Sequence, residues 1–259
     1  MRQLISISLA CVLALAATIA CSANTISVPQ NYPTIQAAVD HAYPGDKIRV
    51  GGGTYHESVT VINTYNIEIS GESGATIIGT GDPFQWGINF FSGGNSVHGM
   101  TIKNCGVGIN TFFAASIHDN TVTACGVGIL AGVAGDGISL PAPTSIDHNL
   151  VYRNNIGIDL SGCQNVTASH NTVLNNGIGF PGIDGGSGIR VEFSDHCFVT
   201  GNLAFTNQIG IIVFGSGNNS ITYNIALGNV EFDAVDVFDN PALGPNVWAH
   251  NFFGITSGI

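Results

Sequence analysis

A short pattern centred on asparagine recurs along the chain, and it constrains the fold more than any other feature. In each copy an apolar residue lies three positions before the Asn and another lies two positions after it, as in Ile117-His118-Asp119-Asn120-Thr121-Val122. The asparagines that fit are Asn120, Asn149, Asn171, Asn202 and Asn224, with Asn251 as a looser match. Their spacings are 29, 22, 31, 22 and 27 residues, which indicates a repeating unit of about 22 residues that tolerates insertions.

A unit of this length cannot bury its apolar side chains alone, so successive units must stack and form hydrogen bonds with one another. An Asn at the same turn of every coil tolerates left-handed backbone and forms hydrogen bonds with neighbouring amides. The pattern therefore predicts an all-β fold, a right-handed single-stranded parallel β-helix with an asparagine ladder. A β-sandwich is disfavoured, because its Asn-Gly hairpin turns do not flank these strands.

The N-terminal residues have the layout of an export signal. Arg2 is followed by an apolar run from Leu4 to Ala20 and then by small residues, which predicts a signal peptide over residues 1–23 and a secreted or periplasmic protein. A lipid anchor at Cys21 is the less favoured alternative. The rest, about 235 residues, is enough for one large domain.

The sequence predicts an N-terminal cap and first coil over residues 24–61 and the β-helix repeats over residues 62–259. In the cap, Ile35, Ala38, Val39 and Ala42 form one apolar stripe of a short helix that can seal the open end of a solenoid. The C-terminal residues offer no matching cap, so we expect that end either to self-associate with another subunit or to be frayed.

Composition limits the partners. The net charge is −11, with only six Lys and Arg residues, which argues against nucleic acid because such proteins need a basic surface. Polyanionic ligands are also disfavoured unless a bound cation offsets the repulsion.

The cap carries a resemblance to a known superfamily. Tyr32-Pro33-Thr34-Ile35-Gln36-Ala37-Ala38-Val39, Pro44-Gly45-Asp46 and Gly53-Thr54-Tyr55-His56-Glu57 are similar to the start of pectin-lyase-like β-helix proteins. The repeats that follow resemble generic parallel β-helix repeats, and no specific enzyme family is matched. The superfamily includes polysaccharide lyases, hydrolases, esterases and epimerases and a copper-binding protein, so the resemblance implies the fold more than the function.

Two coils carry insertions. The step from Asn149 to Ile158 spans nine residues, whereas the steps from Asn120 to Ile138 and from Asn171 to Ile189 span eighteen. We therefore expect two similar loops at the same turn, emerging about 10 Å apart on one edge and walling a cleft. The alternative explanation is that these Gly-rich insertions have no function and are simply tolerated at the turns of a solenoid.

The strands that begin with Gly-Ile indicate which side chains face outward. If each Ile points inward, the next residue points outward, which gives Asn89, Asn110, Ser139, Asp159, Arg190, Ile212 and Asp236. The resemblance implies that an active site lies on this face. Arg190, Asp159 and Glu192 are the catalytic candidates, and Asn110, Ser139 and Asp236 are the substrate-binding candidates.

In this interpretation Arg190 holds a sugar carboxylate or keeps Asp159 ionised, while Asp159 and Glu192 supply acid and base. A surface ion pair between Asp159 and Arg190 is the plainer alternative.

Two cation sites are conceivable. Asp136, Asp159 and Asp184 offer oxygen ligands for Ca²⁺, and no other cofactor is indicated. His148 and His170 precede ladder asparagines on neighbouring coils, so their imidazoles could bind copper or zinc. A pair of histidines that only lines a turn is the alternative.

Four cysteines remain after the leader. Cys105 and Cys125 should lie on adjacent coils, and Cys163 and Cys197 form a second potential pair. For each pair, a disulfide and two buried thiols are both compatible with the sequence.

Three functions follow from these patterns. The first is a polysaccharide lyase or hydrolase with its cleft on the Gly-Ile face. The second is a non-catalytic β-helix that binds carbohydrate or a surface. The third is a periplasmic copper-handling protein.

Overall fold

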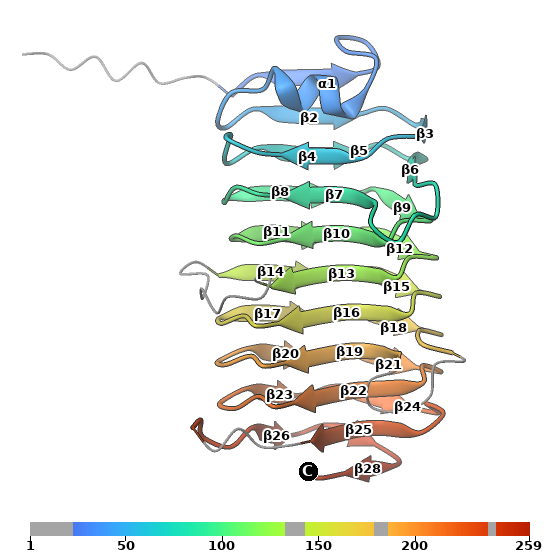
Figure 1. Ribbon diagram of the computed structural model, residues 1–259, viewed down its shortest axis with the longest axis vertical. Coiled ribbons are helices and arrows are strands. Elements are labelled where there is room, and N and C mark those ends of the chain that lie inside the picture. Colours follow the sequence, from blue (N-terminus) through green and yellow to red (C-terminus); the bar gives the residue numbers. More distant parts are fainter. Residues whose placement is uncertain (1–22, 133–142, 179–185, 238–241) are drawn as a thin grey trace, which may run out of the picture.

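The structure is a computed structural model that describes residues 23–132, 143–178, 186–237 and 242–259. The chain winds into a column of stacked coils, and successive strands fall in turn into three parallel sheets (Figure 1). This is the right-handed parallel β-helix that the sequence predicts.

The first sheet has ten strands in the described residues, in the order β1 (Thr25–Val28), β2 (Lys47–Val50), β5 (Glu68–Gly71), β8 (Asn95–His98), β11 (Ala115–His118), β14 (Thr144–Asp147), β17 (Val166–Ser169), β20 (Phe198–Thr200), β23 (Ser220–Thr222) and β26 (Val247–Ala249). The second contains β3 (Gly53–Tyr55), β6 (Ala75–Ile78), β9 (Thr101–Lys103), β12 (Thr121–Thr123), β15 (Leu150–Tyr152), β18 (Thr172–Leu174), β21 (Leu203–Phe205), β24 (Ile225–Leu227) and β27 (Phe252–Phe253). The third contains β4 (Val59–Val61), β7 (Trp86–Phe90), β10 (Val107–Thr111), β13 (Val127–Gly132), β16 (Ile156–Ser161), β19 (Ser187–Glu192), β22 (Ile209–Phe214), β25 (Phe232–Val237) and β28 (Thr256–Ser257).

The core is a stack of aliphatic side chains that point inward from all three sheets. In the third sheet Ile109, Ile129, Ile158 and Ile189 are Cα partners on successive coils, and each has an exposed fraction of 0%. The glycine before each isoleucine is required by close packing. A Cβ on Gly157 would lie 2.4 Å from the carbonyl oxygen of Gly188 on the next coil. The Gly-Ile step is therefore imposed by coil stacking.

Two columns of buried asparagine run along the molecule. In the first column Asn149 donates its backbone N–H and its Nδ2 to Oδ1 of Asn171, both at 3.0 Å, and Asn171 donates in the same way to Asn202. This column extends from Asn120 to Asn251. The second joins Asn154, Asn176, Asn207 and Asn229. The columns satisfy polar groups inside turns that water does not reach.

The cap is a short helix, α1 (Ile35–Asp40), whose apolar residues Ile35, Ala38 and Val39 are buried in the core. Thr34 accepts a hydrogen bond from the N–H of Ala37 at 3.1 Å. The carboxylate of Glu57 accepts from the N–H groups of Ile35 and Gln36 at 3.0 and 2.9 Å. A carboxylate at the first turn satisfies donors that a helix leaves unpaired, and this explains why Glu57 accompanies the cap.

The last described coil consists of β26, β27 and β28. Trp248 and Phe253 pack against the core, whereas Phe252 and Ile255 are exposed. Self-association through this end stays a prediction. No helix in the described part of the chain is long and apolar enough to cross a membrane, and the predicted signal peptide falls almost entirely outside the described residues.

Candidate functional site

The outward column of the third sheet runs through one position of each strand. Its members are in register as Asn89, Asn110, Leu130, Asp159, Arg190, Ile212 and Val235. Each follows a core residue directly, so the alternation of the strand turns it away from the core. Five of the seven predicted positions are confirmed as members of this column.

Asp159 and Arg190 meet on adjacent coils, as predicted. Arg190 donates from Nε to Oδ1 of Asp159 at 3.1 Å and from Nη2 to Oδ2 at 2.7 Å. The same Nη2 lies 3.4 Å from Oε2 of Glu192. The side chain of Asp159 is 4% exposed and that of Arg190 is 19% exposed, so water screens this pair less than a pair on an open surface. One guanidinium thus holds two carboxylates.

A hollow of about 330 Å³ lies beside this ion pair, over β7 to β16. Its lining residues are Trp86, Asn110, Phe112, Leu130, Gly132, Asp159 and Ser161. The wall is aromatic, because the Trp86 and Phe112 rings lie edge to face with centroids 6.4 Å apart and Phe91 stacks on Phe112 at 5.1 Å. The hollow therefore combines an aromatic wall with an amide and a carboxylate.

The amides of this column have hydrogen-bonding capacity left over. Asn110 donates from Nδ2 to Oδ1 of Asn89 at 2.7 Å, and both residues are buried. Oδ1 of Asn110 and Nδ2 of Asn89 have no hydrogen-bond partner among the described residues. Such groups are costly in a folded protein and call for an explanation.

The strand positions expected for two of the substrate-binding candidates need correction. The strand of the coil after β10 begins at Gly128-Ile129 and not at Gly137-Ile138, so Leu130 occupies the position expected for Ser139. Ser139 itself lies outside the described residues. Asp236 is the Cα partner of the core residue Val213, and it accepts hydrogen bonds from Asn246 and from Trp248 Nε1 at 3.1 and 2.9 Å. Asp236 therefore belongs to the inward-facing set, and Val235 takes the outward position.

The two insertions do not share a turn. Residues 133–142 follow β13 and lead to β14, whereas residues 179–185 follow β18 and lead to β19. The first segment follows the C-terminal end of a third-sheet strand, whereas the second precedes the N-terminal end of one. The expectation of two matched loops on one edge is therefore wrong. Of the Ca²⁺ ligands expected there, Asp136 and Asp184 lie outside the described residues, and the Asp159 carboxylate is paired with Arg190.

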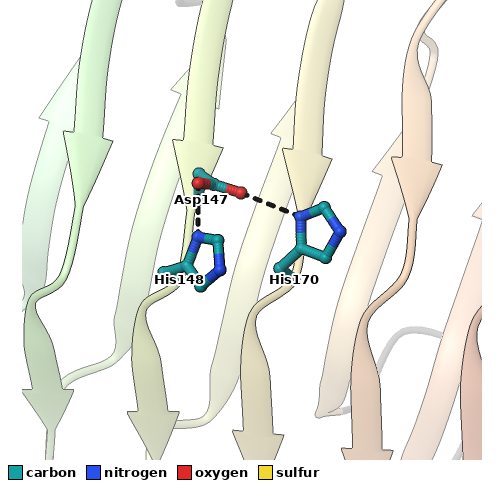
Figure 2. A group of neighbouring side chains, drawn as sticks. All are labelled: Asp147, His148 and His170. Atoms are coloured by element: carbon teal, nitrogen blue, oxygen red, sulfur yellow. Dashed lines mark hydrogen bonds and ion pairs between the residues drawn. The ribbon is translucent and has the colours of Figure 1, made fainter.

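A second cluster lies where the first sheet turns into the second. Asp147 ends β14 and His148 follows it, while His170 follows β17 on the next coil (Figure 2). Nδ1 of His148 lies 2.5 Å from Oδ2 of Asp147, and Nδ1 of His170 lies 3.2 Å from Oδ1 (Figure 2). The two imidazoles stack with centroids 5.1 Å apart, as their sequence positions predict.

The pKa of Asp147 lies below its ordinary value. Burial acts to raise this pKa, but hydrogen bonds from Ser169, His148 and His170 outweigh burial and stabilise the carboxylate. Asp147 was missed from the sequence, although it directly precedes His148 on the outward-facing side of its strand.

The four described cysteines are buried thiols. Sγ of Cys163 lies 3.6 Å from Sγ of Cys197. The pKa of Cys163 is raised by the hydrogen bond with Cys197 and by burial, and the pKa of Cys125 is raised by the hydrogen bond with Cys105 and by burial. Both pairs therefore lie close enough to interact, as the sequence suggests.

The three-sheet column places the protein in the class of right-handed parallel β-helix proteins. A family model described as the right handed beta helix region matches residues 105–256. This is more than half of the chain, and the chain belongs to that family. A search of curated protein sequences finds no match.

Several solved structures share the fold. The chain is similar to the pectate lyase Pel9A, with a TM-score of 0.67 and 13% identity, over 91% of this chain and 78% of the other. A pectin methylesterase from Aspergillus niger gives a TM-score of 0.51 and 13% identity, over 88% of this chain and 84% of the other. The enzymatically active domain of bacteriophage CBA120 tailspike protein 2 gives 0.56 and 12%, over 85% of this chain and 42% of the other. This chain thus spans less than half of the tailspike domain, and all three likenesses concern the fold alone.

Proposed function

We propose that the protein is exported and binds a polysaccharide along the outward face of the third sheet, with one sugar ring in the hollow beside Trp86 and Asp159. The observation that carries this proposal is the combination of an aromatic wall, Trp86 and Phe112, with polar groups on Asn110 and Asp159. A sugar ring has apolar C–H faces that stack on aromatic rings and hydroxyls that bond to amides and carboxylates.

The column of the third sheet also suits an extended ligand. Its outward positions repeat from β7 to β25 on successive coils. Because Ile212 and Val235 are buried, a chain of sugars would lie over the part from β10 to β19, where it meets a new side chain at each coil spacing of about 4.8 Å. The unpartnered Oδ1 of Asn110 would accept a hydrogen bond from a sugar hydroxyl once the surrounding side chains adjust to the ligand. The fold shared with a pectate lyase and a pectin methylesterase supports polysaccharide as the ligand class.

The charges favour a neutral or weakly acidic sugar in the hollow. Arg190 is paired with two carboxylates, Asp159 and Glu192, so the three groups together carry one negative charge. A uronic-acid carboxylate would have to displace Glu192, whose 3.4 Å contact with Arg190 is the longer of the two. We therefore expect uronic-acid polymers to bind more tightly when a cation is present, and Ca²⁺ remains a proposed aid to binding.

The test measures binding of purified protein to immobilised polygalacturonate, alginate, xylan and a neutral glucan, with and without Ca²⁺. Trp86→Ala and Phe112→Ala should each weaken binding at least about fivefold, since a stacked ring contributes on the order of 1–3 kcal/mol. Phe198→Ala is the matched control, because Phe198 is an exposed aromatic on the first sheet. The proposal fails if no polymer binds, or if Phe198→Ala weakens binding as much as Trp86→Ala does.

A second candidate function is cleavage of the bound polymer. It is favoured by the two carboxylates, Asp159 and Glu192, that flank one guanidinium beside the hollow. In this account Arg190 holds Asp159 in place through their ion pair, and Glu192 exchanges the proton. Release of reducing or unsaturated ends, abolished by Glu192→Gln while binding persists, would establish catalysis. Binding without product release leaves the protein as a carbohydrate-binding β-helix.

A further inference from the structure

The strongest unassigned feature is the cluster of Asp147, His148 and His170, which lies apart from the hollow. Two imidazole nitrogens and one carboxylate oxygen lie within 4.8 Å of one another. Zinc bound by such groups sits 2.0–2.2 Å from each ligand atom, which are then roughly 3.4 Å apart. Small side-chain rotations would bring the three atoms to that spacing.

The backbone holds the two histidines in place before any ion arrives. His148 and His170 have left-handed φ angles of 53° and 51°. Each is followed by a ladder residue, Asn149 or Asn171, which is at most 1% exposed. The N–H of His148 donates to Ser169 and that of His170 to Thr200, both at 3.2 Å. The spacing of the two residues therefore follows from the coil repeat, and the backbone has little conformational entropy left to lose on binding.

The carboxylate is held as well. Ser169 donates from Oγ to Oδ1 of Asp147 at 2.7 Å. A hydrogen bond of this kind orients a ligating carboxylate. The side chains of His148 and His170 are 59% and 58% exposed, and that of Asp147 is 31% exposed, so an ion can enter from solvent and keep water in a fourth position.

We propose that Asp147, His148 and His170 form a binding site for a divalent transition-metal ion, with Zn²⁺ or Cu²⁺ as the ion. Two nitrogen ligands and one oxygen ligand suit these ions, whereas Ca²⁺ prefers six or more oxygens. Each imidazole would coordinate through Nδ1, which gives up the proton that it now donates to the carboxylate, and the ring would carry a proton on Nε2 instead. The ion thus replaces the hydrogen bonds that the two rings now make with the carboxylate.

The experiment titrates the full chain with ZnCl₂ in the presence of a chromogenic chelator, and repeats the titration with CuCl₂. Wild type should bind one ion per chain at this site. His148→Asn, His170→Asn and Asp147→Asn should each weaken binding at least about tenfold. Asn is chosen for the histidines because it tolerates the left-handed turn, so the fold is kept, and thermal melting verifies it.

His250→Asn is the matched control. His250 occupies the same left-handed turn position, with φ of 57°, but it stacks on Tyr223 rather than on a histidine. The His250→Asn variant should bind Zn²⁺ as tightly as wild type does. The proposal is overturned if wild type binds neither ion more tightly than millimolar, or if the three ligand variants bind as tightly as wild type. It is also overturned if His250→Asn weakens binding as much as they do.

Discussion

Arg190 and Asp159 are Cα partners on adjacent coils, and a two-point ion pair of 3.1 and 2.7 Å joins their side chains. The pair forms one end of the proposed ligand face, because Asp159 also lines the hollow. The stacking of the coils places the two residues together, so the charge pattern of this face follows directly from the repeat.

Breaking this pair should destabilise the protein. Arg190→Ala leaves the carboxylate of Asp159 buried without its main partner, and we expect a loss of about 2–4 kcal/mol. Asp159→Asn and the double variant complete a cycle in which the coupling energy should be about 1–3 kcal/mol. Urea unfolding of wild type, the two single variants and the double variant gives the four free energies of unfolding. Strictly additive effects of the two single variants would show that the pair contributes nothing.

The ladder asparagines should matter most in the middle of the column. Asn171 is 0% exposed and donates from Nδ2 to Oδ1 of Asn202 and to the carbonyl of Ile146. Asn171→Ala leaves several buried polar groups without their hydrogen-bond partner, so we expect the free energy of unfolding to fall by about 2–4 kcal/mol. Asn251→Ala, at the half-buried end of the same column, should cost less. Equal losses at the two positions would contradict a role for burial.

The end of the second column should be sensitive to acid. Burial acts to raise the pKa of Asp233, but hydrogen bonds from Ile255, Asn229 and Gly254 outweigh it and lower this pKa below its ordinary value. Since the folded-state pKa is depressed, Asp233 adds stability above the ordinary pKa of 3.8, and this contribution is lost as the pH falls through the lowered value.

Asp233→Asn should therefore lower the Tm at pH 7, and its difference from wild type should shrink as the pH falls below about 4. Amide exchange gives a local readout, because the N–H groups of Gly254 and Ile255 donate to Oδ2 of Asp233. The Phe252 amide donates to a backbone carbonyl instead and is the internal control. A difference in Tm that does not change with pH would contradict this prediction.

The four described thiols should resist alkylation in the folded protein. All are at most 6% exposed, so the reagent has little access to any of them. The hydrogen bond with the partner thiol and burial raise the pKa of Cys125 and of Cys163, whereas the same hydrogen bonds lower the pKa of Cys105 and of Cys197, so burial must protect the latter two. Iodoacetamide should therefore modify all four slowly in buffer and readily in denaturant, as followed by mass spectrometry. Rapid modification of the folded protein would contradict the buried placement. Mild oxidation then tests whether Cys163 and Cys197 join.

The sequence predicted the repeats well because each repeated residue has one physical reason to recur. Asn171 recurs because a buried turn needs both a donor and an acceptor, and Gly157 recurs because the next coil leaves no room for a Cβ. Arg190 and Asp159 were paired correctly, since each follows a Gly-Ile step without an ambiguous neighbour.

The errors arose where the repeat offers two alignments. The coil of β13 contains Gly-Ile at 128–129 and again at 137–138, and choosing the second displaced Ser139 and misplaced an insertion. In β25, Asp233-Ala234 replaces the Gly-Ile step, so Asp236 was assigned to the wrong face. Asn110 and Asp159, which line the hollow, were named from the sequence, whereas Trp86 was missed, because its contact with Phe112 joins two coils and no local pattern marks such a contact.

The most direct test of the account follows Trp86 itself while the ligand binds. The sequence contains two tryptophans, so Trp248→Phe leaves Trp86 as the sole indole, with thermal melting to verify the fold. Oligosaccharides of the polymers used above are then titrated while the fluorescence is recorded. We expect a saturable change in Trp86 emission whose midpoint equals the binding constant measured independently. Binding that leaves Trp86 emission unchanged, or no binding by any of these sugars, would contradict it.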